Sequence, residues 1–205
     1  MKLHTYPSAP NPRRVTIFAA EKDIALELVT VDILKGEQRS ADFLQKNPSG
    51  KIPVLELEDG RCISESVAIC RYLEAIKPEP NLFGRNPFEL GHIEARNRQI
   101  ELELWRDIGT SWVNGPVVGA TGRFKQIPEA KEASDKRVTQ YYVRLDEAFA
   151  TSPFVAGERF TVADISLLTA VDFASAMVGL KPDEDLENLY RWHASVSSRP
   201  SVSNG

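Results

Sequence analysis

This 205-residue sequence is poor in the residues that build covalent or metal-held frameworks: it has 2 cysteines, 2 methionines and 3 histidines. Cys62 and Cys70 form no Cys-x-x-Cys pair, and the histidines are scattered along the chain. No spacing typical of a zinc site or of a disulfide framework is therefore present. We expect a protein of a reducing compartment, the cytoplasm, that holds neither a metal nor a disulfide.

Long hydrophobic runs and an excess of positive charge are also missing. No stretch approaches the roughly 20 apolar residues that a membrane span needs, and the first residues enter a strand-like run with no signal-peptide pattern. The net charge of -4 and the pI near 5.5 argue against nucleic acid as a main partner. The hydrophobic fraction of 42% is ordinary for a soluble protein. A length of 205 residues is enough for one large domain or two small ones.

The most informative stretch is residues 47–66. A turn rich in Pro and Gly leads to Pro53, which suits the first position of a strand because its missing N–H is tolerated there. A short apolar run follows, then the hairpin dipeptide Asp59-Gly60 and a second short strand. A helix is expected to begin near Ser64–Ser66, so the stretch predicts a strand, a hairpin, a strand and a helix.

Glu65 and Ser66 at the start of that helix indicate a binding site. A helix N-terminus presents unpaired N–H groups and a partial positive charge, which suit a carboxylate, and the Ser66 hydroxyl is an added donor. The neighbouring Glu65 carboxylate suits an ammonium group. An amino-acid-like end of a small peptide would satisfy both, and the Ile52 main chain can add hydrogen bonds to an extended peptide. The alternative is an ordinary first-turn acid and a helix cap.

The order Pro-Ser-Gly-Lys-Ile-Pro-Val-Leu, acidic-Gly hairpin and Ile-Ser-Glu-Ser resembles the thioredoxin-like domain of cytosolic glutathione transferases. Residues 154–164 resemble the structural motif of the all-helical half of the same family, in which Asp164 folds the helix start and does not catalyse. The resemblance implies an α/β thioredoxin-like domain over residues 1–77, a linker over 78–87 and an all-α domain over 88–205.

The pattern along the chain agrees with that division. Apolar spacing and cap residues predict two strands and a helix before the central stretch, with Asn11 as the N-cap and Pro12 as the first helical residue. A short helix is expected at residues 40–46. After the linker, strand patterns vanish and the spacing predicts helices over residues 90–114, 130–150, 161–178 and 186–196.

The resemblance places the group that stabilises the glutathione thiolate in the loop after the first strand, which holds Ser8 and Asn11. The run Ser8-Ala9-Pro10-Asn11, followed by Gly36-Glu37-Gln38-Arg39 and Lys51-Ile52-Pro53, is most similar to Nu-class bacterial and Ure2-like transferases, in which the Asn faces the sulfur. The simpler interpretations are a loop residue for Ser8 and a plain N-cap for Asn11.

Tyr6 lies near the place where other classes of the family put a catalytic Tyr, but its place in a strand favours the core. Arg13 and Arg14 lie in a first helical turn, where the helix dipole disfavours cations. They are expected on the solvated surface, and the alternative is that they raise the local potential for an anionic peptide.

Other site residues are also implied by the resemblance. Gln38 and Lys51 are expected near the glycyl carboxylate of glutathione, and a cis Ile52-Pro53 bond is expected to aim the Ile52 main chain at the cysteinyl residue. Trp105 and Trp112 are seven apart, so they share a helix face. They are expected to line an electrophile pocket between the domains, or else to pack in the helical core or against a partner.

The implied function is a glutathione transferase of detoxification, which promotes attack of glutathione on an electrophile or glutathione-dependent reduction of a disulfide or peroxide. Glutathione is then a co-substrate, no cofactor is permanently bound, and the protein is expected to be a homodimer. The alternative is a non-catalytic transferase-like binding or regulatory protein, because the fold does not guarantee turnover.

Overall fold

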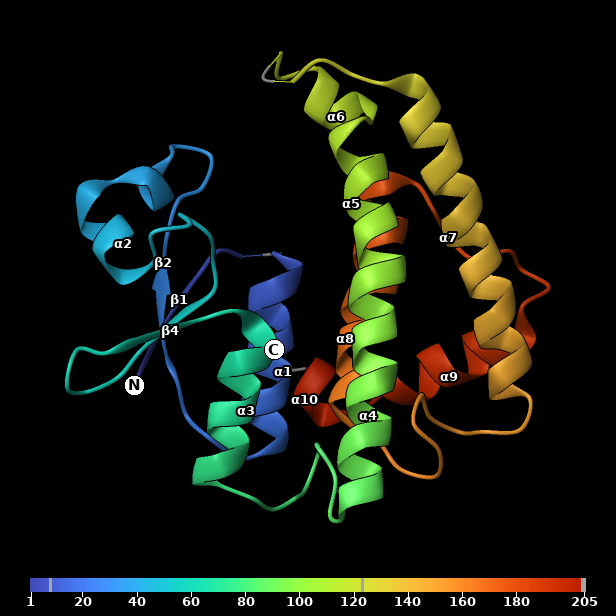
Figure 1. The fold of residues 1–205 in the computed structure, drawn as a ribbon, viewed down its shortest axis with the longest axis horizontal. Coiled ribbons are helices and arrows are strands. Elements are labelled where there is room, and N and C mark those ends of the chain that lie inside the picture. Colours follow the sequence, from blue (N-terminus) through green and yellow to red (C-terminus); the bar gives the residue numbers. More distant parts are fainter. Residues whose placement is uncertain (8, 123, 204–205) are drawn as a thin grey trace. The chain divides into compact units, whose positions relative to one another are not determined.

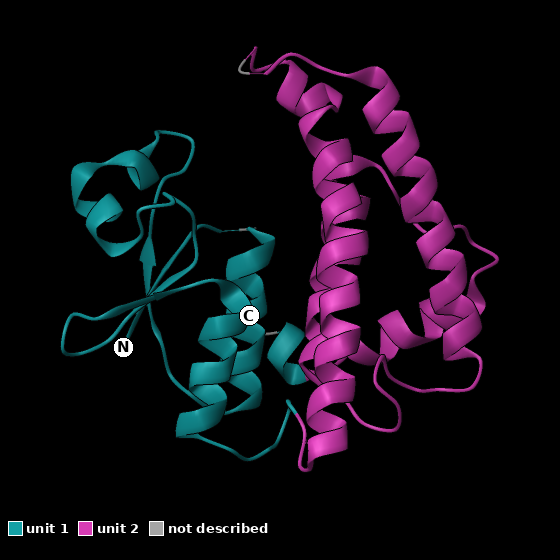
Figure 2. Ribbon diagram, viewed as in Figure 1, with its two compact units in different colours: residues 1–83, 200–205 teal, residues 84–199 magenta. Residues whose placement is uncertain are grey.

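The computed structural model describes residues 1–7, 9–122 and 124–203, and the chain divides into two compact units (Figure 2). Unit 1 comprises residues 1–83 and 200–205, and unit 2 comprises residues 84–199. The change of unit thus falls inside the stretch whose composition predicts a linker. The last residues return to unit 1, because the Ser201 hydroxyl donates to the Glu21 carboxylate at 2.5 Å.

Unit 1 is built on a four-stranded mixed sheet of order β2-β1-β3-β4. β1 (Lys2–Thr5) runs parallel to β2 (Glu27–Thr30), and β3 (Val54–Glu56) is antiparallel to both β1 and β4 (Cys62–Ser64). The connection from β1 to β2 carries a helix, as parallel neighbours require. This is the expected thioredoxin-like arrangement.

Helices cover both faces of this sheet. α1 (Pro10–Glu21) and α3 (Ser66–Ile76) pack side by side, visible in Figure 1, and bury an apolar core against the strands. A 3₁₀ turn, η1 (Glu37–Arg39), and α2 (Ala41–Lys46) follow β2. α2 begins where expected, since the Ser40 hydroxyl accepts the Phe43 N–H. The core of α1, α3 and the sheet includes Leu3, Val15, Phe18, Leu55, Ile69 and Leu73.

The start of α1 differs from the sequence-based expectation. The N-cap is Ala9, with no side-chain cap, and Pro10 is the first helical residue, so the prediction of Asn11 as N-cap is wrong. The reason is that the first-turn N–H groups have no partner inside a helix, so both Pro10 and Pro12 fit within that turn. Asn11 therefore lies in the first turn, with its side chain exposed.

Unit 2 opens with a helical stretch that runs from Pro87 to Val113. It consists of α4 (Pro87–Gln99), a π-helical segment η2 (Ile100–Trp105) and α5 (Arg106–Val113). The expected single helix over residues 90–114 is thus present, with a π segment that apolar spacing alone does not reveal. The short α6 (Pro116–Gly119) follows.

The centre of unit 2 is α8 (Val162–Phe173), whose residues are almost all buried. α8 continues into a second π segment, η3 (Ala174–Val178). α7 (Pro128–Phe149) packs on α5, and α9 (Glu187–Ser197) packs on α7 and α8. α10 (Pro200–Ser203) belongs to unit 1.

Asp164 organises the start of α8. Its carboxylate accepts the Thr161 N–H and the Val155 N–H, each at 2.9 Å, and the Trp192 indole N–H at 2.9 Å. Thr161 completes a capping box by accepting the Ala163 N–H. Burial raises the pKa of Asp164 to about 6, against the opposing effect of these donors. The folding role expected for this residue fits these contacts.

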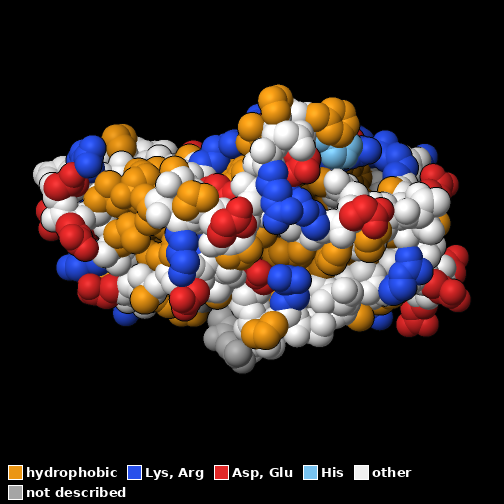
Figure 3. All heavy atoms as spheres, turned by 90° about the horizontal axis from the view of Figure 1, so that it is seen from below, with side chains coloured by type: hydrophobic (Ala, Val, Ile, Leu, Met, Phe, Trp, Pro, Cys, Tyr) orange, Lys and Arg blue, Asp and Glu red, His pale blue; other side chains and the backbone are white. Residues whose placement is uncertain are grey.

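Two features are absent from the part of the chain that the structure describes, namely a membrane-spanning helix and a metal-binding group of side chains. No helix in this part of the chain is long and apolar enough to cross a membrane. Among residues 1–7, 9–122 and 124–203, no three His, Cys, Asp or Glu side chains are grouped so that they could hold a metal ion. On the face drawn in Figure 3, acidic and basic side chains are interspersed with hydrophobic ones.

Candidate functional site

One end of the unit 1 sheet gathers most of the residues singled out in the sequence. In the β3–β4 ladder Val54 pairs with Ser64, so Pro53 and Glu65 extend past the same end of the two strands. In the β1–β3 ladder His4 pairs with Val54, which brings the end of β1 beside Pro53. The segment leading into α1 and the start of α3 therefore meet at this sheet end.

The Ile52-Pro53 peptide bond is cis, as predicted from the sequence. Pro53 is buried, and the Ile52 side chain packs against the cluster of Val31, Phe43 and Val54. Within the described residues, no hydrogen bond engages the N–H or the C=O of Ile52. Both groups are therefore available to a ligand that lies along the end of the sheet.

Glu65 has an unusual backbone conformation. It is the N-cap of α3 with φ 69° and ψ 117°, a region that non-glycine residues rarely adopt. Its side chain is exposed and makes no cap hydrogen bond to the helix. A conformation of this kind costs on the order of 1–3 kcal/mol and persists where the surroundings impose it, often at ligand clamps. The carboxylate is thus held at the helix start without serving as a cap.

Ser66, the first residue of α3, is buried and accepts a hydrogen bond from Arg14 Nη1 at 3.0 Å. Because its oxygen accepts from Arg14, its own O–H can donate to a second group. The guanidinium of Arg14 is itself buried, with a relative exposure of 2%. A cation, a hydroxyl and a helix N-terminus therefore act on one point, a combination that favours a bound carboxylate.

The expectation that Arg14 is solvated is wrong. Arg14 lies one turn before Phe18, on the face of α1 that packs into the core. That spacing relates Arg14 to buried positions and is visible in the sequence. The helix dipole makes a cation unfavourable in a first helical turn, which favours a solvated position for Arg14. The hydrogen bond to Ser66 offsets the cost of placing the cation there.

Lys51 belongs to a loop whose shape is fixed by Asn47. The Asn47 side-chain amide donates to the Lys51 C=O at 2.7 Å, and its oxygen accepts the Ser49 N–H at 3.1 Å. The Asn47 side chain is nearly buried, with a relative exposure of 5%. The buried Asn47 side chain thus fixes the shape of the loop, while the Lys51 side chain is exposed to solvent.

The same loop packs on η1, which carries Gln38. Gly50 has φ 59°, and a Cβ there would lie 2.9 Å from the Gln38 C=O and 2.7 Å from Arg39 Nη1. Arg39 also donates to the Ser49 C=O at 3.3 Å. The Gln38 amide donates to the Ile33 C=O at 3.3 Å. Gln38 and Lys51 are therefore on adjoining segments, as a shared ligand would require.

The two candidates for the thiolate donor are Asn11 and Ser8. Asn11 is exposed in the first turn of α1, one turn before Arg14, and so lies beside the unpaired N–H groups of that helix. Ser8 lies outside the described residues. Tyr6, expected in the core, is half-buried, and its C=O accepts the Ala9 N–H at 3.1 Å.

Trp105 and Trp112 lie on one face of the long helical stretch of unit 2, as their spacing predicts. Their rings are 5.9 Å and 5.4 Å from the ring of Phe173 at the end of α8. Both are half-buried. This aromatic group therefore contributes to packing within unit 2.

Comparisons with known proteins agree on one family. Residues 9–76 match the model described as glutathione S-transferase, N-terminal domain, and residues 113–200 match the one described as glutathione S-transferase, C-terminal domain. The chain is 35% identical over 205 residues to glutathione S-transferase 2 of Saccharomyces cerevisiae, a match that covers 98% of this chain and 88% of the relative. It is 34% identical over 198 residues to human glutathione S-transferase theta-2B, covering 91% and 76%.

Solved structures give the same result. The crystal structure of Gtt2 from Saccharomyces cerevisiae superposes with a TM-score of 0.92 at 34% identity, covering 100% of this chain and 99% of that one. A glutathione S-transferase domain-containing protein of Marinobacter aquaeolei superposes with a TM-score of 0.89 at 34% identity, covering 98% and 100%. The resemblance drawn from the sequence motifs and the two-part fold it implied are confirmed.

Proposed function

This chain is a member of the glutathione S-transferase family, and on that premise we propose that it binds glutathione on unit 1, holds the thiol as a thiolate and directs it at an electrophile. The observation that carries the proposal is the start of α3. There the exposed Glu65 carboxylate is held in a strained backbone conformation next to Ser66, whose hydroxyl is backed by the buried Arg14.

Glutathione has charged groups that correspond to these features. Its γ-glutamyl end carries an ammonium, which suits Glu65, and a carboxylate, which suits the Ser66 hydroxyl and the free N–H groups of α3. The cysteinyl residue is an extended peptide unit, with one donor and one acceptor that match the unengaged main chain of Ile52. The glycyl carboxylate suits the exposed ammonium of Lys51 and the amide of Gln38.

Thiolate stabilisation requires no general base in this proposal. A free thiol has a pKa of about 8.5, so lowering it by about 2 units needs roughly 2.7 kcal/mol. One charge-assisted hydrogen bond supplies about 1.5–3 kcal/mol. The exposed amide of Asn11 and the helix N-terminus on which it lies are sufficient together. Ser8 is the other candidate donor, and the two assignments predict different effects of substitution.

The proposed reaction is nucleophilic attack of the thiolate sulfur on an electrophilic carbon. A sulfur–carbon bond forms, the leaving group departs with the bonding electron pair, and the thiol proton has already passed to solvent. Trp105 and Trp112 are the proposed contacts for the electrophile. The proposal also includes glutathione-dependent reduction of a disulfide or peroxide, in which two glutathione molecules are oxidised to one disulfide.

The deciding experiment is a pH titration of glutathione bound to the protein, followed by the ultraviolet absorbance of the thiolate. We expect the bound thiol to titrate about 2 pH units below free glutathione, and turnover to be found with a panel of aryl halides, epoxides and mixed disulfides. Binding without a shifted thiol pKa and without turnover would instead support the alternative, a non-catalytic binding or regulatory protein.

Assembly and location belong to the same proposal. We infer a homodimer, a cytoplasmic location and a role in detoxification from membership of the family. Light scattering at micromolar concentration is expected to give twice the chain mass of 22.9 kDa. A monomer mass under those conditions would contradict the assembly while leaving the glutathione site untouched.

A further inference from the structure

The sheet face that α2 covers carries a polar cluster of three side chains from three elements. His4 on β1 and Lys46 at the end of α2 meet at one oxygen of Glu56 on β3, because His4 Nε2 and Lys46 Nζ each lie 2.7 Å from Glu56 Oε2. His4 pairs with Val54 in the β1–β3 ladder, and Val54 and Glu56 are two positions apart, so these side chains share a face of the sheet. The cluster therefore ties α2 to two strands.

The cluster is partly shielded from water. The exposed fraction of the side chain is 9% for His4, 22% for Glu56 and 32% for Lys46. The hydrogen bond from Lys46, and after it the one from His4, lowers the pKa of Glu56 to about 2, so the carboxylate is ionised at neutral pH. Phe43 of α2 also packs edge-on against the His4 ring, with 6.1 Å between the ring centroids. An ionised carboxylate with two donors in such surroundings is a stronger tie than an exposed ion pair.

The ion pair of Lys46 and Glu56 closes the loop that supplies one part of the proposed glutathione site. Lys46 is the last residue of α2 and Glu56 is the last residue of β3, so the pair joins the two ends of the segment between them. That segment contains Lys51 and Ile52. Asn47 fixes the shape of the loop from within, and the ion pair fixes its base.

We propose that Lys46 and Glu56 are positioning residues for the part of the site that receives the cysteinyl and glycyl residues of glutathione. Through the loop that they close, they hold the Ile52 main chain and the Lys51 ammonium in place before the ligand arrives. A loop that is ordered in advance binds with a smaller entropic cost. The inference rests on the proposed function, because it requires glutathione to bind at this loop, and it includes no chemical step.

The first test is calorimetric titration of the parent and of Lys46→Met with S-methylglutathione. The substitution keeps an apolar stem and removes the ammonium, and we expect the dissociation constant to rise about fivefold, the upper range for a partly exposed ion pair. Lys46→Arg keeps the cation and should restore most of the affinity. The matched control is Lys2→Met, which removes an exposed lysine of the same sheet that lies 4.0 Å from the Glu27 carboxylate, and it should leave the affinity unchanged.

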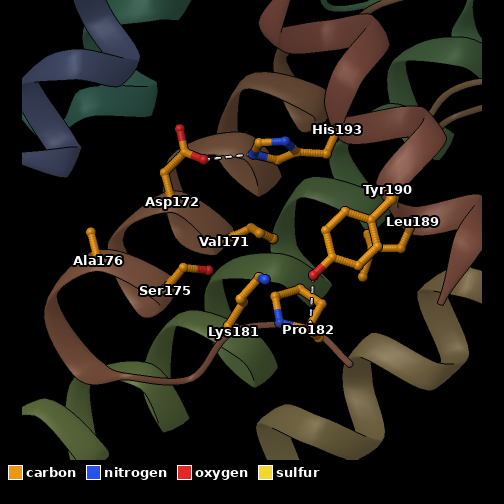
Figure 4. Close-up of a pocket in the computed structure, with 9 residues that line it drawn as sticks. All are labelled: Val171, Asp172, Ser175, Ala176, Lys181, Pro182, Leu189, Tyr190 and His193. Carbon is orange, nitrogen blue, oxygen red and sulfur yellow. Dashed lines mark hydrogen bonds and ion pairs between the residues drawn. The ribbon is translucent and has the colours of Figure 1, made fainter. Parts of the chain in front are cut away.

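Glu56→Gln tests the other partner of the pair and should give a similar loss of affinity. Its control is a histidine–carboxylate pair of the same length in unit 2, in which His193 Nε2 and Asp172 Oδ1 lie 2.7 Å apart at the wall of a cavity (Figure 4). Asp172→Asn removes the charge of that pair. It should leave the affinity for S-methylglutathione unchanged, because the pair has no part in the loop between α2 and β3.

A double-mutant cycle separates positioning from a general loss of stability. Lys46→Met and Lys51→Met act through one loop, so the double variant should lose less affinity than the product of the two single losses. Lys46→Met and Glu65→Ala act on different elements, so their losses should multiply. A merely structural role of Lys46 would give the same result in both cycles. Should Lys46→Met fail to fold, Glu56→Gln takes its place in both cycles.

Two results overturn the inference alone: a parent that binds S-methylglutathione no more tightly than Lys46→Met and Glu56→Gln do, or losses that multiply in the cycle with Lys51→Met. A parent that does not bind S-methylglutathione at all would refute the proposed glutathione site and this inference with it. The two failures are therefore distinguished by the titration of the parent.

Discussion

Replacement of Glu65 by alanine separates ligand recognition from folding more clearly than any other change in unit 1. The Glu65 side chain is exposed and makes no cap hydrogen bond, so its removal leaves no buried group without a partner. The backbone conformation, with φ 69°, is retained because alanine has the same Cβ. The free energy of unfolding is therefore expected to change by no more than about 0.5 kcal/mol.

The effect on binding should be much larger. In the proposed complex the Glu65 carboxylate pairs with the ammonium of glutathione, and a hydrogen bond to a charged group contributes about 1.5–3 kcal/mol. The dissociation constant for glutathione should therefore rise by roughly 10- to 150-fold. Glu65→Gln tests the charge separately, since it keeps the length of the side chain and should give an intermediate loss.

Calorimetric titration with S-methylglutathione measures the affinity without interference from thiol oxidation, and urea unfolding measures the stability. Glu58→Ala is the matched control, because Glu58 is an exposed acid in the neighbouring β3–β4 hairpin. Equal affinities of parent and Glu65→Ala would refute the assignment of this site. A loss of stability as large as the loss of affinity would show that Glu65 serves the fold instead.

Three further predictions follow from the same contacts. Asn11→Ala should raise the pKa of the bound glutathione thiol, followed by thiolate absorbance, with little loss of stability because Asn11 is not the N-cap; a larger shift in Ser8→Ala would reassign the donor. Arg14→Met should weaken S-methylglutathione binding by about tenfold in calorimetry, although Arg14 is buried behind Ser66; unchanged affinity would remove it from the site. Burial raises the pKa of Asp164 to about 6, so its contribution to stability is present at low pH and lost as the pH rises through about 6. In urea unfolding, the loss of unfolding free energy caused by Asp164→Ala should be about 1.4 kcal/mol larger at pH 5 than at pH 7.5. A smaller loss at pH 5 than at pH 7.5 would contradict this.

Much of the fold is readable from local sequence rules. The Asp59-Gly60 hairpin forms as expected, with Gly60 at φ 83°, because only the turn chemistry of two residues is involved. The capping box at Thr161 and Asp164 likewise depends on residues three positions apart. The cis bond before Pro53 is predicted because X-Pro bonds tolerate cis and because a cis bond there aims the Ile52 main chain at an extended peptide ligand.

The features that the sequence did not predict depend on contacts between distant segments or on small differences in helix geometry. Arg14 and Ser66 are 52 positions apart, and nothing within either segment indicates that they meet. The start of α1 at Pro10 was missed because two prolines compete for the first turn and both can be accommodated. The π segments η2 and η3 add one residue to a helical turn without a change in apolar pattern large enough to be recognised.

The candidate site depends most on the register of two very short strands. β3 and β4 have three residues each, and the pairing of Val54 with Ser64 decides that Pro53 and Glu65 extend past the same sheet end. A shift by one residue would turn every side chain of a strand to the opposite face. Val54 and Leu55 are adjacent in β3 and both buried, so a shift would exchange the side chains that fill the two covered faces of the sheet and would disturb the packing of both. The hydrophobic residues of β3 thus keep the main chain of Ile52 and the start of α3 in the relation that recognition of a peptide end requires.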